Sequence, residues 1–583
     1  MPRRRRFGRG IAVLLATAVA FLAPVPMVTT PVAHAADPSV PPVPETYLNQ
    51  ELTWDDCVED LDSQCAKVTV PMDWKNPSRG NLILAVAYLP AKGKSQGLLT
   101  SNPGGPSVPG LSLTEELSAS KGNLRQYDLL GFDPRGFGRS SKIKCETTKD
   151  KLKKLPMVAD RRVRNRTTHA MEVAEAKLFG EACSSQPLAR YINTQQTVWD
   201  LEFLRRLMET SWDKSYPKLN YIGYSYGTWL GAWYADTYPS RVGKFILDSN
   251  MQWTSTMYAN QALDSMSFQR RRDKMLFPYL ARHNSDFKLG KSAKAVKKTY
   301  ESTRAKLAKQ AKKDLAKKKT PVLGPEDLDY ITSSLIYANE SFPSAGYIIQ
   351  AAAKYAKKPS SSGYSRTLSK RIKTPMKKAP FAVQRSAKAV SGSAKIDISD
   401  GLAGTIVRCN DSVTPGNLRA LLQRADADAK RYPFTGYLNT ISLCAYWKFK
   451  PQTRTIDLAG APKMLMFQSE GDPATAYEGA LAAHRKTGSK TVLVSVDNEG
   501  QHGLYIDGPS KCLEAIGDAY LFTTGNPPPR DTRCSTSPLP DDKKVYPLAG
   551  PVSGAKSTAK KVVKAKNYDL KRVRADVAKR GLG

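Results

Sequence analysis

A serine flanked by glycines is the residue best suited to chemistry in this chain of 583 residues. Ser225 lies in Gly223-Tyr224-Ser225-Tyr226-Gly227, after the apolar run Leu219–Gly223 and before a helical pattern. This context is typical of a nucleophile elbow, in which a strained turn exposes the hydroxyl at the top of a sheet and small residues let strand and helix approach. The alternative is an ordinary strand-to-helix turn. We predict that Ser225 is a nucleophile.

A serine nucleophile needs a base, and in folds with this elbow the chain order is serine, acid, histidine. Of the five histidines, only two follow the serine outside a basic insertion. His484 lies at a polar position of a helical pattern, which favours a solvated side chain. His502 lies in a glycine-flanked loop after the apolar run Thr491–Val496. We therefore predict that His502 is the base.

The acid of such a triad is expected on a loop after the preceding strand. Asp472 follows the apolar run Lys463–Phe467 and precedes Pro473 and a helical pattern. A carboxylate there would orient the imidazole and stabilise its protonated form. Glu470 is the fallback, and a simple helix cap is the other role open to Asp472. We predict Asp472 as the acid.

Two backbone N–H groups are needed to bind the negative charge that develops on the substrate oxygen. Tyr226, directly after the nucleophile, is predicted to supply one. The second is predicted to come from Gly104 or Gly105, in Asn102-Pro103-Gly104-Gly105-Pro106 after an earlier apolar run, because glycine lets the backbone approach a substrate closely. A glycine-proline surface turn is the alternative.

Short β-branched or leucine-rich runs alternate with longer helical patterns through most of the chain. Runs of this kind, separated by helices, indicate a mostly parallel sheet with helices on both faces, which is an α/β fold. From the amino end, the predicted strands are Leu82–Leu89, Gly97–Thr100, Tyr127–Phe132, Leu219–Gly223, Lys244–Leu247, Lys463–Phe467 and Thr491–Val496.

The strand pattern lapses after the elbow. Between Lys291 and Lys319 there are twelve basic and two acidic residues in an alanine- and lysine-rich pattern, which favours a solvated helix. We predict a helical lid inserted into the sheet domain, with strands resuming after Ile406. The predicted segments are 51–249 for the first part of the core, 250–400 for the basic lid, 401–530 for the second part of the core and 531–583 for a basic tail.

The first residues predict export. Arg3 to Arg6 and Arg9 precede the apolar run Ile11–Leu22 and a small-residue site near Ala35, as in a signal peptide. Residues 36–50 are proline-rich and predict an extended spacer. In an oxidising compartment the eight cysteines predict disulfides, which proximity suggests are Cys57–Cys65, Cys145–Cys183, Cys409–Cys444 and Cys512–Cys534.

Composition excludes several classes of protein. The hydrophobic fraction of 41% is too high for a disordered chain, and no internal run is long and apolar enough for a multi-pass membrane protein. No Cys-x-x-Cys or His-x-x-x-His spacing predicts a metal site. We find no dinucleotide fingerprint, phosphate-binding loop or other cofactor motif, and expect neither metal nor cofactor.

An ordered set of motifs runs through most of the chain. The motifs are Trp54–Cys57, Val70–Trp74, Asn102–Pro106, Asp133–Gly136, Gly223–Thr228, Cys409–Asp411, Gly471–Pro473 and His502–Gly503. In these motifs the chain resembles the secreted tripeptidyl aminopeptidases, actinobacterial α/β-hydrolases related to proline iminopeptidases.

The resemblance implies an α/β-hydrolase fold and a serine exopeptidase that removes short peptides from a free N-terminus, beneath a lid. The chain departs from the family in Ser107-Val108-Pro109-Gly110, where a more glycine-rich stretch is expected. Binding a free amine also requires a carboxylate, for which Asp411 and Glu340 are candidates.

Two other functions remain open at this stage. A carboxylesterase or lipase acting on envelope or environmental esters would share the triad and differ only in its pocket. A surface-binding protein is the third hypothesis, because the net charge is +36 and Gly554 to Gly583 carries ten basic and two acidic residues. Such a tail would attract anionic cell-wall polymers or lipids. Nucleic acid is not an expected partner of an exported chain, and peptides are the expected substrates of the leading hypothesis.

Overall fold

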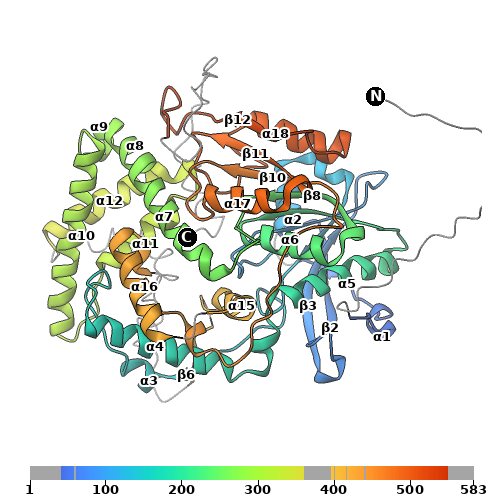
Figure 1. Ribbon diagram of the computed structural model, residues 1–583, viewed down its shortest axis with the longest axis horizontal. Coiled ribbons are helices and arrows are strands. Elements are labelled where there is room, and N and C mark those ends of the chain that lie inside the picture. Colours follow the sequence, from blue (N-terminus) through green and yellow to red (C-terminus); the bar gives the residue numbers. More distant parts are fainter. Residues whose placement is uncertain are drawn as a thin grey trace, which may run out of the picture. The chain divides into compact units, whose positions relative to one another are not determined.

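A ten-stranded sheet forms the centre of the protein (Figure 1). The computed structural model describes residues 41–57, 61–359, 395–399, 401–414, 417–438 and 441–548; the predicted signal peptide and most of the predicted basic tail lie outside these ranges. The strand order is β1-β2-β3-β5-β4-β7-β8-β10-β11-β12. Neighbours from β5 to β12 are parallel, and β1, β2, β3 and β5 pair antiparallel. This order, with its strand-to-helix crossovers, is the predicted α/β-hydrolase fold.

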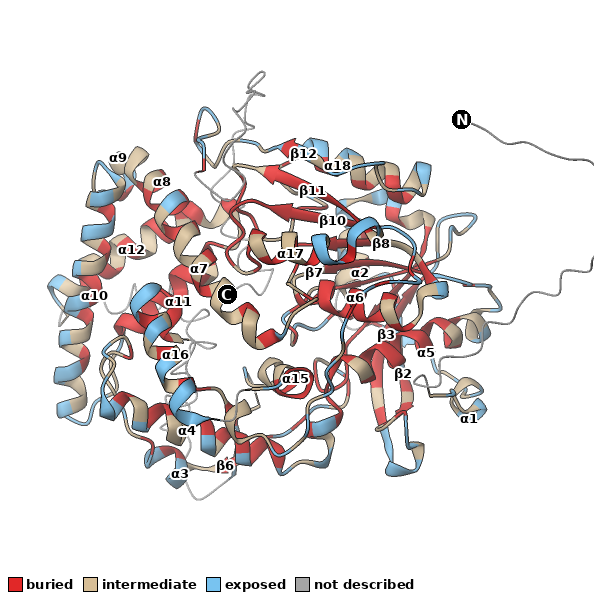
Figure 2. Ribbon diagram, in the orientation of Figure 1, coloured by how far each residue is buried: buried red, intermediate tan, exposed pale blue. Residues whose placement is uncertain are grey.

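Each strand predicted from the sequence is present, with its ends moved by a few residues. The parallel strands have almost wholly buried side chains, as expected where helices cover both faces (Figure 2). The sheet strands are β1 Asp55–Asp56, β2 Gln64–Pro71, β3 Asn81–Leu89, β4 Leu98–Asn102, β5 Asp128–Phe132, β7 Leu219–Tyr224, β8 Val242–Asp248, β10 Met464–Ser469, β11 Thr491–Asp497 and β12 Thr532–Ser535.

Helices cover the sheet on both faces. On one face α5 (Thr194–Trp212), α6 (Tyr226–Thr237) and α17 (Tyr477–Thr487) pack in one apolar cluster with the strands. On the other, α2 (Leu113–Ser120), α18 (Lys511–Asp518) and the π-helical turn η10 (Ala519–Thr524) contribute to a second cluster. Because β7 runs directly into α6, the elbow serine lies at the carboxyl end of the parallel strands.

The described residues of the segment predicted as a lid are mostly helical, and helices continue beyond residue 400. The prediction that strands resume after Ile406 is wrong: Ala403–Asp411 and Leu418–Arg431 are helices, and the next strand of the central sheet among the described residues is β10. The strand Lys395–Asp397 (β9) pairs with Glu146–Thr148 (β6) outside that sheet. The helices of these regions are α3 Lys149–Lys153, α4 Arg166–Ser184, α7 Met257–Arg271, α8 Phe277–Arg282, α9 Asn284–Phe287, α10 Ala293–Ala316, α11 Pro325–Leu335, α12 Phe342–Lys357, α15 Ala403–Asp411 and α16 Leu418–Arg431.

A buried ionic network joins the elements of this lid. The carboxylate of Asp329, in α11, accepts from Arg304 at 2.6 Å, Arg162 at 3.1 Å, Tyr300 at 2.7 Å and Tyr437 at 2.8 Å. Asp329 is fully buried, and despite burial the two guanidinium groups lower its pKa. A buried charge is tolerated only when paired and hydrogen-bonded in this way.

The segment that was predicted to begin the basic tail belongs in part to the folded core. Residues 532–535 form β12, which pairs with β11. This short edge strand was not predicted because its sequence is polar. We call residues 536–548 the C-terminal strap. Asp542 in the strap accepts from Arg282 and His283 at the end of α8, and Leu548 N–H donates to Asn498 at 2.8 Å. The strap therefore joins the lid to the loop before His502.

Disulfide bonds join all four predicted cysteine pairs: Cys57–Cys65, Cys145–Cys183, Cys409–Cys444 and Cys512–Cys534. Four disulfides are typical of a protein that folds in an oxidising, extracellular environment. Within the described ranges, no helix has the length and apolar character needed to cross a bilayer. The predicted proline-rich spacer is not wholly extended, because Glu45–Leu48 forms a helical turn, α1.

Candidate active site

Ser225 has the geometry of a nucleophile elbow. Its φ of 58° and ψ of −121° are strained for a residue with a side chain. Its N–H donates to the carbonyl of Asp248, at the end of β8, over 3.0 Å. A Cβ on Gly223 would lie 2.6 Å from the carbonyl oxygen of Gly227, and one on Gly227 the same distance from the Asn102 carbonyl. Only glycine fits at either position, which explains the spacing seen in the sequence.

The structure brings Asp472 and His502 together from two loops. The His502 imidazole Nδ1 lies 2.9 Å from Oδ1 and 3.0 Å from Oδ2 of Asp472, which is fully buried. The same carboxylate accepts from the N–H groups of Ala474 and Thr475 at 2.9 and 2.8 Å. Asp472 thus contacts the imidazole and caps a turn, but it does not cap the helix α17 that follows, whose N-cap is Ala476.

The lid fixes the backbone of His502. Its N–H donates to the carbonyl of Tyr337 at 2.8 Å, and the Tyr337 ring lies edge-on to the imidazole, with centroids 5.2 Å apart. Burial alone would lower the pKa of His502, but the adjacent Asp472 carboxylate outweighs it, and the pKa is raised above its usual 6.5. The imidazolium formed during proton transfer is therefore stabilised.

Asp248 supports the nucleophile and the base at once. Besides accepting from Ser225 through its carbonyl, it accepts from the N–H groups of Leu504 and Tyr505 through its carboxylate, at 2.8 and 2.7 Å. Burial raises the pKa of this carboxyl to about 7. The loop after His502 and the elbow are therefore held by one side chain.

A second hydrogen bond joins the elbow to the loop after His502: the hydroxyl of Tyr224 donates to the Tyr505 carbonyl at 3.0 Å. In the part of the chain described, no hydrogen bond joins the Ser225 hydroxyl to the imidazole. Catalytic hydrogen bonds are often long without substrate and shorten when it binds. The arrangement can therefore perform acyl transfer once a substrate closes it.

The predicted oxyanion-binding loop lies beside the elbow. A Cβ on Gly104 would lie 2.5 Å from the Tyr224 carbonyl and 2.8 Å from Cβ of Ser225, so this backbone touches the nucleophile. The Gly104 N–H donates to the Asn102 side chain at 3.0 Å. Neither Gly105 N–H nor Tyr226 N–H has an acceptor among the described residues. Gly105 and Tyr226 are thus better placed as donors to an oxyanion than Gly104.

The two carboxylates predicted to bind a substrate amine are placed differently. Asp411 is buried, and its two oxygens accept from the N–H and hydroxyl of Thr194 at the start of α5. It therefore stabilises that helix terminus and has no lone oxygen turned to substrate. Glu340 lies in the 3₁₀ turn Asn339–Ser341 of the lid, where its charge acts on buried Arg271. The fallback acid Glu470 accepts from the N–H of Asn498 at 2.8 Å.

Several residues of the site were missed in the sequence. Asp248 directly follows a predicted strand, at the edge where functional side chains gather, and that position was a usable signal. Asn102 lies within the loop motif that was singled out for its glycines. Tyr337 lies in the helical lid, where no motif marks it.

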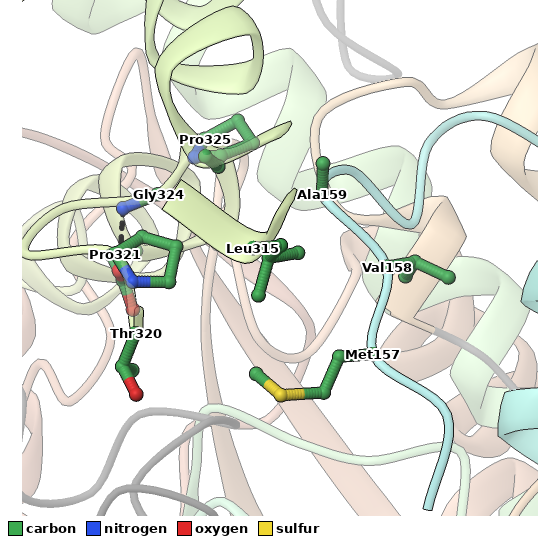
Figure 3. A pocket seen from close by; sticks show the side chains of 10 residues that line it. Met157, Val158, Ala159, Leu315, Thr320, Pro321, Gly324 and Pro325 are labelled. Atoms are coloured by element: carbon green, nitrogen blue, oxygen red, sulfur yellow. Dashed lines mark hydrogen bonds between the residues drawn. The ribbon is translucent and has the colours of Figure 1, made fainter. Parts of the chain in front are cut away.

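A small hollow of the described surface, formed by other residues than the triad, is mostly apolar. The pocket in Figure 3, of about 30 Å³, lies between residues 157–159 and the α10–α11 connection. Its lining is apolar except for Thr320 and Asp327, and the Asp327 carboxylate accepts from Gly324 N–H at 2.8 Å. Within the described ranges, no group of histidine, cysteine and acidic side chains is arranged to hold a metal ion.

The chain is similar to known peptidases over most of its length and to an esterase over a shorter stretch. A family model described as TAP-like protein matches residues 432–534. The chain is 29% identical to a tripeptidyl aminopeptidase of Streptomyces lividans over 512 residues, covering 84% of this chain and 87% of that one. It is 26% identical to serine protease Hip1 of Mycobacterium tuberculosis, covering 84% and 92%. It is 33% identical to carboxylesterase B of Mycobacterium tuberculosis over 135 residues, covering 21% and 26%. These findings confirm the resemblance to the tripeptidyl aminopeptidases and the α/β-hydrolase fold.

Proposed function

We propose that this chain, a relative of the tripeptidyl aminopeptidases, is a serine exopeptidase that hydrolyses peptides from a free N-terminus. The observation that carries the proposal is the Asp472–His502 pair, held beside a strained elbow serine at the carboxyl edge of the sheet. The named relatives that match most of the chain are a tripeptidyl aminopeptidase and a serine protease. The proposed catalytic residues are Ser225, His502 and Asp472.

Acylation begins when Ser225 Oγ attacks the scissile carbonyl carbon and its proton passes to His502 Nε2. Asp472, bonded to Nδ1–H, keeps the imidazole in the required tautomer and stabilises the imidazolium. The negative charge on the former carbonyl oxygen is received by the N–H groups of Tyr226 and Gly105. The intermediate then collapses, the C–N bond breaks, and the leaving amine takes the proton from His502.

Deacylation repeats these steps with water as the nucleophile. His502 removes a proton from the water, the water oxygen attacks the acyl carbon, and the ester bond to Ser225 breaks as its oxygen regains the proton. The released product is the short peptide that carried the free N-terminus. The lid, which contacts His502 through Tyr337, limits the substrate to a chain end that can reach the serine.

The test separates the enzyme class from the substrate class. A fluorophosphonate probe is expected to label Ser225 in the purified protein and to leave Ser225→Ala unlabelled. Tripeptide anilides with a free N-terminus are expected to be cleaved, and their acetylated counterparts are not. Labelling without this preference, together with rapid hydrolysis of simple esters, would instead support the carboxylesterase reading.

We also propose that the chain is exported, is cleaved near Ala35 and is associated with anionic cell-wall polymers or lipids through its basic tail. The arginine-rich amino end, the four disulfides and the ten basic residues from Gly554 to Gly583 support this. Deleting residues 554–583 is expected to release the protein from isolated walls at low salt. Unchanged association after deletion would refute the role of the tail.

A further inference from the structure

One acidic side chain near the triad, Asp264, has no hydrogen-bond or ion-pair partner among the residues that the structure describes. Asp264 lies in α7, the first helix of the lid, and is partly buried. No hydrogen bond or ion pair joins its carboxylate to any other residue that the structure describes. Nearby acids are engaged: Asp472 binds His502, and Glu478 binds Arg270 through both oxygens. An unpaired carboxylate is unusual in so basic a chain.

Contacts on α7 hold Asp264 close to the triad. The hydroxyl of Ser267, one turn further along the helix, donates to the carbonyl of Pro473 at 2.7 Å and contacts that of Asp264 at 3.1 Å. Pro473 directly follows Asp472 in the chain. The Arg270–Glu478 pair fixes the next turn of α7 to α17 at 2.7 and 3.1 Å. The turn that carries Asp264 is therefore fixed against the loop that carries the catalytic acid.

The charged groups around Asp264 come from four separate elements. Arg408 approaches from α15, Asp472 from the loop after β10, His502 from the loop after β11, and Tyr337 from the connection after α11. The Arg408 guanidinium, like the Asp264 carboxylate, forms no hydrogen bond or ion pair within the described ranges. Burial, and then the negative charge of Asp472, raise the pKa of Asp264 to about 7, although Arg408 and His502 oppose this. A cation bound at Asp264 would stabilise the charged form of this carboxylate.

The other candidate carboxylates do not offer such a position. Both oxygens of Asp411 are used by Thr194, and Asp248 is fully engaged with backbone N–H groups and the Ser249 hydroxyl. Asp264 alone among these three acids has oxygens without a donor. The α-ammonium of a peptide, with an ordinary pKa of about 7.7–8.0, is the cation that the proposed reaction brings to this place.

We infer that Asp264 binds the free α-ammonium group of the substrate and thereby selects peptide N-termini, with Arg408 and Tyr337 as its neighbours in the same subsite. This inference rests on the proposed function. It replaces Asp411 and Glu340, the two candidates that the sequence had suggested for the role. A peptide with a blocked N-terminus brings no positive charge to Asp264 and leaves the carboxylate without a partner.

The test compares Asp264→Asn with Asp286→Asn, a matched loss of one acid at an exposed position of the lid. For a free tripeptide anilide, Asp264→Asn is expected to lower kcat/KM by about 100-fold, mainly through KM, because one partner of a desolvated charge pair is lost. The ratio of kcat/KM for free over acetylated substrate is expected to collapse toward one. Asp286→Asn should keep the wild-type ratio, and Asp264→Glu should restore part of it.

A pH series gives a second readout. In the wild type, KM for the free peptide is expected to rise as the pH falls below about 7, since protonated Asp264 no longer attracts the ammonium group. In Asp264→Asn this rise should disappear. A wild-type preference for free N-termini that persists in Asp264→Asn would overturn the inference alone. Wild-type protein with no such preference would overturn the proposed exopeptidase as well, and fluorophosphonate labelling of Ser225 would show whether any hydrolase remains.

Discussion

The sheet and the lid are held together by different physics. The strands that carry the triad pack almost entirely through apolar side chains, and all six residues of β10 are buried. The lid has its own apolar cluster, but it also buries Asp329 among two guanidinium groups and two tyrosine hydroxyls. Apolar packing is non-directional, whereas a buried ion pair stabilises only one geometry. We therefore expect the geometry of the lid to depend more on individual polar contacts than the geometry of the sheet does.

The proposed catalytic residues and the residues that position the lid lie in different parts of the structure. Ser225, Asp472 and His502 lie on loops at the edge of a rigid sheet, and their side chains carry little of its packing. The lid residues that contact them, Tyr337 and α7, owe their position to polar contacts with few alternatives. We expect substitutions at the triad to remove activity without unfolding the protein. Substitutions in the lid network are instead expected to lower stability.

The largest expected effect is that of Ser225→Ala. Removing the nucleophile should lower kcat by about 10⁵-fold, as for triad residues that act as a unit. The thermal unfolding midpoint should stay within about 1 °C of the wild type, or rise, because the Ser225 side chain makes no hydrogen bond in the described structure. Steady-state kinetics and calorimetry on the same sample check both parts. Substantial residual activity would mean that another residue is the nucleophile.

Replacing Asp329 by Ala is the matching change in the lid. It leaves Arg162 and Arg304 with less compensation and removes the Asp329 acceptor of the Tyr300 and Tyr437 hydroxyls, so unfolding should require about 3–5 kcal/mol less free energy. Denaturant unfolding measures the loss, and hydrogen exchange should show it first in α10 and α11. If exchange rises equally in β10 and β11, the sheet and the lid do not differ as described.

A pH profile tests the electrostatics of the triad separately from the lid subsite. With a small ester that lacks an amine, kcat/KM should fall about tenfold per pH unit below the pKa of His502, since the base must be neutral to accept the serine proton. Because Asp472 raises that pKa, the acidic limb should lie above 6.5. A limb at or below 6.5 would contradict the coupling inferred from the short Asp472–His502 contact.

The smallest expected effect is that of Arg272→Met. This buried guanidinium lies 4.2 Å from the centre of the Phe434 ring and donates to Asp273 through Nε at 2.8 Å, while its other two nitrogens have no hydrogen-bond partner in the described structure. A methionine of similar length keeps the packing and removes a desolvated charge. Because Asp273 and Glu301 keep Lys297 and Arg162 as partners, stability should change by no more than about 1 kcal/mol. Chemical denaturation checks this. A loss as large as that of Asp329→Ala would show that the whole lid depends on its charges.

The contrast between the sheet and the lid also explains which features could be predicted from the sequence. The elbow, the acid, the base and each predicted strand are encoded in short local patterns, so their existence could be predicted without knowing the fold. The partners in the lid network are far apart in the chain: Arg162 and Asp329 are separated by 167 residues. Nothing in the pattern around Asp264 distinguishes it from any polar residue of a helix. The extent of the lid was misjudged for the same reason.

The C-terminal strap is synthesised after every residue of the proposed triad, yet it packs beside that site. Leu548 packs beside Gly471, next to Asp472, and the strap also holds the end of α8 and the loop before His502. A chain still being synthesised displays Ser225 when its acid, its base and its strap do not yet exist. Under the proposed mechanism, hydrolysis therefore requires a chain synthesised at least as far as His502.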